Sequence, residues 1–176
     1  NGISVTYGNE ALVYGVRGVH EDFQFIENAD MVEGRFLNYT DIENSAKTLV
    51  IGNKIRKDVF GHLDSPIGEY VDISGIPFKI VGVFKEQRER EEETMYIPLS
   101  TAQRVFNGGD RINNMAFTLP AVGTFDQAVA EAVAFKEDLK QYLSQVHTIH
   151  PEDDSALNVF SALEEAKRYY SLTNNI

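Results

Sequence analysis

The sequence predicts an α+β protein in which one unit, built from both ends of the chain, encloses a smaller α/β unit. Apolar and polar residues alternate near the N-terminus and again through the middle of the chain, as they do in strands with one buried face. Two segments with helical spacing open on capping-box patterns, at Ser100–Gln103 and at Thr124–Gln127. Between them, Asn107-Gly108-Gly109-Asp110 has the composition of a linker.

The composition is that of a folded globular protein with one ordinary domain or two small subdomains. The chain has 176 residues, of which 43% are hydrophobic and 24% are charged. Its net charge of −11 argues against binding to nucleic acid or anionic lipid, because their phosphate groups would be repelled. The sequence has no cysteine, which excludes disulfides, thiolate catalysis and cysteine metal sites. No run of about 18 apolar residues, the length needed to cross a bilayer, is present. The chain starts at Asn1 without an initiator Met or a signal segment, so we expect an excised fragment.

Strands dominate the first part of the expected fold. Ile3–Tyr7 alternates between apolar and polar residues, and Gly8-Asn9 supplies a turn into a second strand. Thr48–Gly52 is a short apolar run suited to a buried strand. Asn53 is expected to cap a helix that Gly61 ends.

The middle of the chain continues as a hairpin, a charged loop, a strand and a helix. Glu69–Phe84 alternates in polarity around a turn at Ser74-Gly75. Lys85–Glu93 is densely charged and predicts a solvated loop that cannot pack inward. Met95–Ile97 returns as a strand, and the helix that opens at Ser100 ends just before the linker.

The segment after the linker predicts a split βαβ arrangement. Ile112–Leu119 alternates as a strand, Thr124 opens the longest helix, and Val146–His150 is expected to return as a short strand to the same sheet. A last helix is expected from Ser155 onward. The long helix has one apolar face, formed by Phe125, Ala128, Val129, Ala132, Leu139, Tyr142, Leu143 and Val146. The last helix has one apolar stripe, formed by Val159, Phe160, Leu163, Ala166 and Tyr170.

These elements predict a discontinuous organisation. The N-terminal strands and the segment after Asp110 have the pattern of one sheet-and-helix unit, which makes the middle of the chain an insertion. We therefore predict that residues 1–28 and 107–176 form one subdomain, and that residues 29–106 form the inserted α/β subdomain.

The sequence contains no pattern typical of a catalytic or ligand site. His147 and His150 are three residues apart, so on a strand they would face opposite sides, and no carboxylate close in sequence completes a ligand set. The glycines form no phosphate loop or dinucleotide fingerprint, and the serines form no nucleophile elbow. We predict no catalytic residue, no cofactor-binding residue and no metal ligand.

Three charged or aromatic features have two interpretations each. Arg88–Glu93 predicts a solvated loop, and it is also the first candidate for a contact loop. Asp153-Asp154 is expected to stabilise the N-terminus of the last helix rather than to bind calcium. Tyr169-Tyr170 is suited to a membrane interface or to packing against the preceding subdomain.

Six short motifs follow one another with short gaps through the middle of the chain. They are Met31–Phe36, Thr48–Gly52, Asp58–Gly61, Pro66–Gly68, Phe78–Val83 and Met95–Ala102. This ordered series resembles the extracytoplasmic domain of MacB/FtsX-type ABC transporter permeases. The resemblance covers most of the chain and implies a discontinuous, porter-like subdomain next to the membrane, with the inserted α/β subdomain further out.

The resemblance also implies a function. The chain would be the extracytoplasmic domain of an efflux or export permease in the bacterial inner membrane, with no enzyme activity of its own. ATP would be hydrolysed on a separate subunit or domain, and its energy would shift this domain against its twin in a permease dimer. The motion would reach an extracytoplasmic adaptor or cargo protein. The last helix, Ala156–Leu172, would be the mechanical link, since it would continue into a membrane span.

Other functions remain open at this point. Lipoprotein release and control of cell-wall hydrolases share the same architecture, and a fold does not choose among such tasks. A secreted ligand-binding module is an alternative from another class, which a signal peptide without downstream membrane spans would favour. A hydrolase that uses scattered carboxylates is the third, and it would require two titrating acidic groups in one deep cleft.

Overall fold

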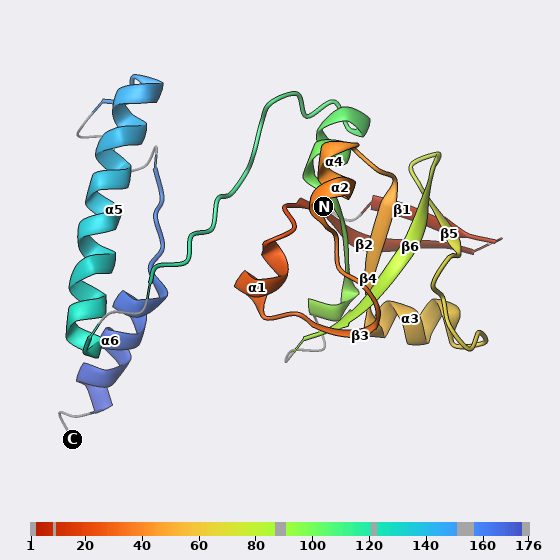
Figure 1. Cartoon of the computed structure of the whole chain (residues 1–176), viewed down its shortest axis with the longest axis horizontal. Coiled ribbons are helices and arrows are strands. Elements are labelled where there is room, and N and C mark those ends of the chain that lie inside the picture. The colour runs from red at the N-terminus through yellow and green to blue at the C-terminus, as the bar shows by residue number, and fades with distance from the viewer. Residues whose placement is uncertain (1–2, 9, 87–90, 121–122, 151–156, 174–176) are drawn as a thin grey trace. The chain divides into compact units, whose positions relative to one another are not determined.

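A computed structural model describes residues 3–8, 10–86, 91–120, 123–150 and 157–173. The chain forms two compact units, Asn1–Phe117 and Thr118–Ile176, which we call the first and second units. The first unit is a curled sheet with short helices, and the second is a pair of helices (Figure 1). The α+β class predicted from the sequence is confirmed.

A seven-stranded sheet forms the first unit. Its strands are β1 (Ile3–Tyr7), β2 (Glu10–Val19), β3 (Asp30–Gly34), β4 (Thr48–Gly52), β5 (Tyr70–Ile73), β6 (Ile76–Lys85) and β7 (Thr94–Pro98). Their order is β3-β6-β4-β7-β2-β1-β5, and β5 also pairs with β6. This last pairing closes six strands into a ring and leaves β3 as the strand with one neighbour. Strands β2 and β7 run parallel, as do β4 and β6.

Both faces of the sheet are packed. On one face, the strands and α3 (Asn53–Phe60) enclose the larger hydrophobic core, made of Val5, Leu49, Ile51, Ile55, Val59, Phe60, Val71, Ile73, Phe78, Ile80, Val83, Met95 and Ile97. On the other face lies a smaller cluster, made of Val19, Ala29, Phe36, Leu37, Val50, Phe84 and Tyr96. The rings of Phe84 and Tyr96 stack with centroids 4.8 Å apart. The apolar run of β4 therefore serves both cores, which explains its continuous hydrophobicity.

The remaining elements of the first unit are short helices. They are α1 (Phe23–Glu27), α2 (Tyr39–Glu43), the 3₁₀ turn η1 (Glu91–Glu93) and α4 (Leu99–Val105). The hairpin predicted around Ser74-Gly75 is confirmed, and both turn residues have positive φ, 54° and 84°. The predicted strand Thr48–Gly52 and the helix end at Gly61 are also confirmed.

Only one of the three predicted helix caps forms. The capping box at Thr124 is confirmed, with Thr124 and Gln127 satisfying each other's backbone amides. The Asn53 cap is wrong, because the backbone turns into the helix at Gly52. The Ser100 box is also wrong. Helix α4 starts two residues earlier than the pattern indicates, and the Ser100 hydroxyl donates instead to the carbonyl of Ile42 near the end of α2.

The second unit contains α5 (Phe125–His147) and α6 (Ala162–Thr173). Two ion pairs join them: Lys136 to Glu164, 3.0 Å apart, and Lys167 to Asp126, 2.9 Å apart. The strand predicted at Val146–His150 is wrong, because α5 continues through His147 and ends on Thr148 in a left-handed conformation. The last helix begins at Ala162, later than predicted. Asp153-Asp154 and the predicted helix start at Ser155 lie outside the described residues.

The strand predicted at Ile112–Leu119 is wrong. These residues have no regular secondary structure, and Ile112, Met115 and Phe117 are about half exposed. An alternating pattern can form a strand only where a neighbouring strand satisfies its backbone groups.

Residues 3–19 and 48–98 belong to one ring of strands, although the sequence places them in different subdomains. The first unit therefore includes β1 and β2 together with the whole inserted segment. The predicted grouping of residues 1–28 with residues 107–176 stays a prediction.

Candidate interaction surfaces

The two histidines that the sequence offers as a possible metal pair lie at the end of α5 and just beyond it. His147 lies in the last turn of α5, and His150 lines a groove of about 900 Å³ along the same helix, next to Gln141, Ser144 and Leu157. Within the described residues, no group of three or more His, Cys, Asp or Glu side chains is placed to hold a metal ion. The described helices also include none that is long and apolar enough to cross a membrane.

The charged connection between β6 and β7 departs from the predicted solvated loop at both of its ends. Arg88–Arg90 lie outside the described residues, but Glu86 and Glu92 are buried, with 9% and 3% of their surface exposed. Glu92 accepts a hydrogen bond from the backbone amide of Glu86 at 3.3 Å. The absence of a side chain at Gly52 allows this packing, since a Cβ there would lie 2.0 Å from the carbonyl oxygen of Glu92. The prediction that this segment cannot pack inward is therefore wrong at its ends.

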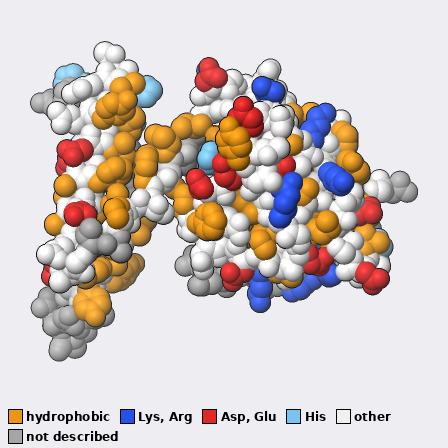
Figure 2. Space-filling view, in the orientation of Figure 1, with side chains coloured by type: hydrophobic (Ala, Val, Ile, Leu, Met, Phe, Trp, Pro, Cys, Tyr) orange, Lys and Arg blue, Asp and Glu red, His pale blue; other side chains and the backbone are white. Residues whose placement is uncertain are grey.

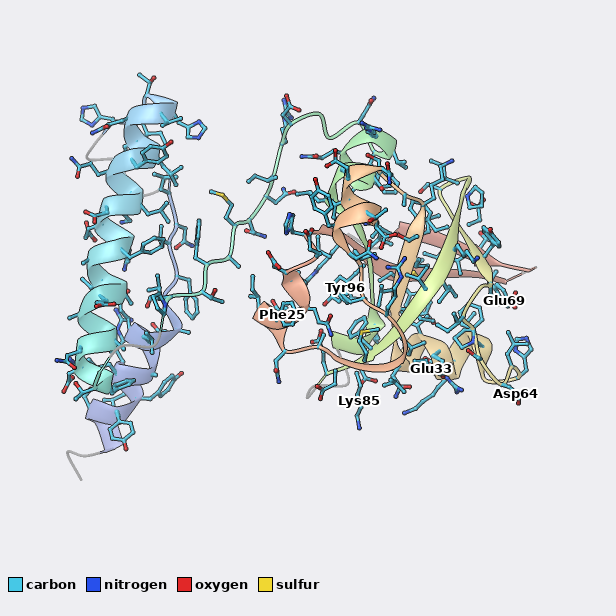
Figure 3. The ribbon with its side chains drawn as sticks, viewed as in Figure 1. Phe25, Glu33, Asp64, Glu69, Lys85 and Tyr96 are labelled. Atoms are coloured by element: carbon cyan, nitrogen blue, oxygen red, sulfur yellow. The ribbon has the colours of Figure 1, made fainter. Side chains whose placement is uncertain are left out.

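Tyr96 connects the buried Glu86 to the smaller hydrophobic cluster. Its hydroxyl donates to Oε1 of Glu86 at 3.1 Å, and its ring packs against Phe23, Phe36 and Phe84. Figure 3 labels Tyr96 within the first unit. Burial, together with the nearby charge of Glu86, raises the pKa of Tyr96 far above its ordinary value. Tyr96 is thus a neutral donor at physiological pH. The hydrogen bond from this phenol to Glu86 holds the start of the β6–β7 connection in place.

A second polar network ties the loop after α3 to β3. Glu33 accepts hydrogen bonds from Nε of Arg56 at 2.8 Å and from the hydroxyl of Ser65 at 2.7 Å. Arg56 also donates to the backbone carbonyl of Asp64 at 3.1 Å, and Figure 3 shows Glu33 and Asp64 around α3. The bonds from Ser65 and Arg56 lower the pKa of Glu33. These bonds hold the loop after α3 against β3, so the network is structural. Asp64 contributes its backbone carbonyl rather than its side chain.

A third network holds the segment between β3 and α2. Arg35 Nη1 donates to Asp41 at 2.5 Å, and Arg35 Nη2 donates to the same carboxylate at 3.2 Å. Asp41 also accepts from the backbone amide of Asn38, and Asn38 accepts from that of Asp41, which forms a capping box. Burial by itself would raise the pKa of Asp41, but the hydrogen bonds from Arg35 and Asn38 lower it below its ordinary value.

The Asp41 network predicts an acid-sensitive stability. Asp41→Asn is expected to lower the free energy of unfolding by about 1–3 kcal/mol at pH 7, because it removes charge-assisted hydrogen bonds from a buried group. The folded state depresses the pKa of Asp41, so its contribution is present above the ordinary aspartate pKa of about 3.9 and is lost as pH falls toward the lower folded value. The difference between the two proteins should therefore shrink below about pH 4.

Urea unfolding at several pH values measures this difference. The matched control is Asp64→Asn, because the Asp64 side chain is exposed. This control is expected to change stability by less than about 0.5 kcal/mol at every pH. A loss in Asp41→Asn that stays constant from pH 7 to pH 3 would contradict the role of the carboxylate charge.

The helix pair of the second unit exposes many apolar side chains. Val129 and Ala132 of α5 are buried, as predicted, but Phe125, Tyr142 and Val146 of the same predicted face are exposed. Most residues of the apolar stripe predicted for the last helix are also exposed to solvent. Phe160 precedes α6 and is 76% exposed, and the side chain of Tyr170 is 66% exposed. The side chain of Tyr169 is exposed too, and the interpretations of Tyr169-Tyr170 given by the sequence both stay predictions.

One surface was missed by sequence reasoning. Helix α1 has no buried residue, and its Phe25 and Ile26 side chains are 76% and 36% exposed. Figure 3 labels Phe25 on this helix. The available signal was the composition of residues 20–30, which combine Phe23, Phe25 and Ile26 with four acidic residues and no Lys or Arg. We call Phe25, Ile26, Glu21, Asp22, Glu27 and Asp30 the α1 patch.

Comparison with known proteins identifies the family. A family model described as the MacB-like periplasmic core domain matches residues 1–135. The chain belongs to this family. Membership places it on the extracytoplasmic side of the membrane and confirms the resemblance drawn from the six motifs.

Named relatives agree with this assignment. The chain is 30% identical over 178 residues to the pyoverdine export ATP-binding/permease protein PvdT of Pseudomonas syringae pv. syringae, a match that covers 97% of this chain and 23% of that protein. It is 20% identical over 162 residues to the macrolide export ATP-binding/permease protein MacB of Hyphomonas neptunium, covering 89% of this chain and 24% of that protein. The chain therefore spans about a quarter of the length of these relatives.

Solved structures support the fold. The periplasmic region of MacB from Actinobacillus actinomycetemcomitans matches with a TM-score of 0.66 and 23% identity, over 84% of this chain and 64% of that one. The extracellular domain of the noncanonical ABC-type transporter YknZ from Gram-positive bacteria matches with a TM-score of 0.54 and 23% identity, over 61% of this chain and 55% of that one.

Proposed function

We propose that this MacB-like domain belongs to an export-type ABC permease subunit and couples ATP-driven motion to an adaptor or cargo protein outside the membrane. The observation that carries the proposal is the alignment of 97% of the chain with a segment of an export ATP-binding/permease protein. ATP would be hydrolysed on the nucleotide-binding part of the transporter, and the domain itself would catalyse no step. The permease would act as a dimer in the bacterial inner membrane.

The build of the two units supports a mechanical role. A ring of paired strands with packed faces resists deformation, so the first unit can move as a rigid body. The ion pairs Lys136–Glu164 and Lys167–Asp126 hold α5 and α6 along each other. Rigid elements of this kind are what coupling between distant sites requires. We also propose that residues 1–28 lie together with residues 107–176 next to the membrane.

A distance measurement in the intact transporter tests the coupling. The chain has no cysteine, so Val13→Cys, on the exposed side of β2 where Val13 is 72% exposed, can carry a spin label within the domain. We expect the label-to-label distance between the two copies of a dimer to change when ATP is added, because the ATP-driven motion reaches this domain. The control is the same labelled transporter with its ATP-binding site disabled, in which the distance distribution should not respond to ATP. A distribution that is the same with and without ATP would overturn the proposal.

A further inference from the structure

The α1 patch combines an exposed aromatic side chain with an excess of negative charge. Phe23, in the same five-residue helix, packs against Tyr96 with ring centroids 5.3 Å apart and so anchors α1 to the smaller core. With the helix held in this way, Phe25 and Ile26 face solvent rather than the core. Figure 2 shows hydrophobic side chains over α1 with acidic side chains beside them.

The acidic rim has little positive charge to balance it. Glu27 and Asp30 form no ion pair with a basic side chain of the described residues, although Lys85 lies opposite Asp30 in the β3–β6 pairing. Glu21 and Asp22 lie 3.2 Å and 3.6 Å from the nitrogens of His20, which provide a full positive charge only when the imidazole is protonated. Four carboxylates within ten residues of sequence therefore give this part of the first unit a negative potential.

This arrangement has the anatomy of a protein interface. Single exposed apolar residues are common, but interfaces characteristically place an aromatic anchor at the centre and polar groups at the rim. Phe25 would be the anchor, with Ile26 beside it. The acidic rim would select the charge of the partner and speed its approach.

Charge decides among the possible occupants. The second unit, residues 118–176, has four basic and nine acidic side chains, a net charge of −5, and a second copy of the whole chain has −11. The acidic rim would repel both of them, and it would repel anionic lipid as well. A segment with basic residues flanking an apolar face would instead bind favourably to both parts of the patch, its apolar face to Phe25 and Ile26 and its basic residues to the acidic rim.

We propose that the α1 patch is a docking surface for a basic, apolar-faced segment of an extracytoplasmic protein partner. The proposal deepens the function above and rests on it only for the location of the partner. It predicts binding that weakens with salt, because the acidic rim contributes through long-range electrostatics. It also predicts that one aromatic side chain dominates the affinity.

Titration of the ¹⁵N-labelled 176-residue chain with a synthetic amphipathic Leu/Lys helix of about 18 residues tests this surface by NMR. We expect chemical-shift changes centred on residues 21–32. Phe25→Ser should weaken binding about tenfold or more, as loss of an interface hot spot does. The double variant Glu27→Gln/Asp30→Asn should weaken binding at low salt and reduce its salt dependence.

Matched variants elsewhere on the first unit control for general attraction to an acidic protein. Tyr70→Ser removes another exposed aromatic, 59% exposed on β5, and Asp58→Asn/Asp64→Asn removes two other exposed carboxylates. These variants should bind the peptide within about twofold of the unchanged chain. Shifts spread over the whole acidic surface or centred on the second unit, or equal losses in the control variants, would overturn the proposal.

The binding experiment uses the isolated chain and needs no ATP, so its failure is distinguishable from failure of the proposed coupling. If the ATP-dependent distance change occurs but the peptide does not map to α1, the coupling proposal stands and this docking surface is rejected. If the peptide maps to α1 but the distance does not respond to ATP, the reverse holds.

Discussion

Gly82→Ala is expected to destabilise the first unit by about 1–3 kcal/mol, the usual cost of forcing extra atoms into a packed site. A Cβ at position 82 would lie 2.0 Å from the carbonyl oxygen of Arg35 and 2.7 Å from the methyl group of Met31. The Met31 side chain can rotate away, but the oxygen belongs to a backbone held by the bond from the Arg35 amide to Val81. Relief of the clash must therefore displace the segment that carries Arg35, which would weaken its ion pair with Asp41.

The matched control is Gly15→Ala in β2, where the nearest atom to an added Cβ, on Thr94, is at an ordinary 3.5 Å. This control is expected to change stability by less than about 0.5 kcal/mol. Urea unfolding of both variants, followed by circular dichroism, gives the comparison, and the m-value should not change. Equal stability of the two variants would show that the segment after β3, which carries Arg35, can shift away from β6 at little cost.

The second large effect is expected on transport. In the intact permease, Ala162→Gly/Ala166→Gly should loosen α6 by about 1 kcal/mol per glycine, because glycine loses more backbone entropy in a helix than alanine does. Both alanines are exposed, so the change removes helix propensity without removing packing. If α6 transmits motion, transport should fall while basal ATP hydrolysis continues, since the nucleotide-binding part is unchanged.

A double substitution in α5 supplies the control. Ala130 and Ala134 are also exposed alanines four residues apart, but they lie in α5. This helix has 23 residues against 12 in α6, so its other turns keep it helical when two glycines are introduced. Ala130→Gly/Ala134→Gly should therefore leave transport closer to normal. Substrate export and ATP hydrolysis, measured in the same membrane preparation, give the readout. Unchanged transport in the α6 variant would mean that α6 is only a tether and that motion reaches the domain by another route.

The sequence by itself determined which segments are strands and helices wherever the signal was local. The hairpin around Ser74-Gly75 formed as predicted because its turn residues accept positive φ and its strands alternate in polarity. The Thr124 capping box formed because both of its hydrogen bonds join residues three positions apart. The six motifs also indicated the family, and four of them overlap the strands β3, β4, β6 and β7.

The tertiary structure decided the features that depend on partners distant in the chain. Pairing of β5 with β1, which is distant in the chain, closes the ring, and no local pattern indicates that these two strands meet. Ile112–Leu119 has the alternation of a strand, but no strand of the described residues pairs with it. Glu92 is buried in a run of acidic residues because Gly52 leaves room for its backbone. Phe25 is exposed because Phe23 occupies the place against Tyr96, so the candidate docking surface arises from packing that spacing alone does not encode.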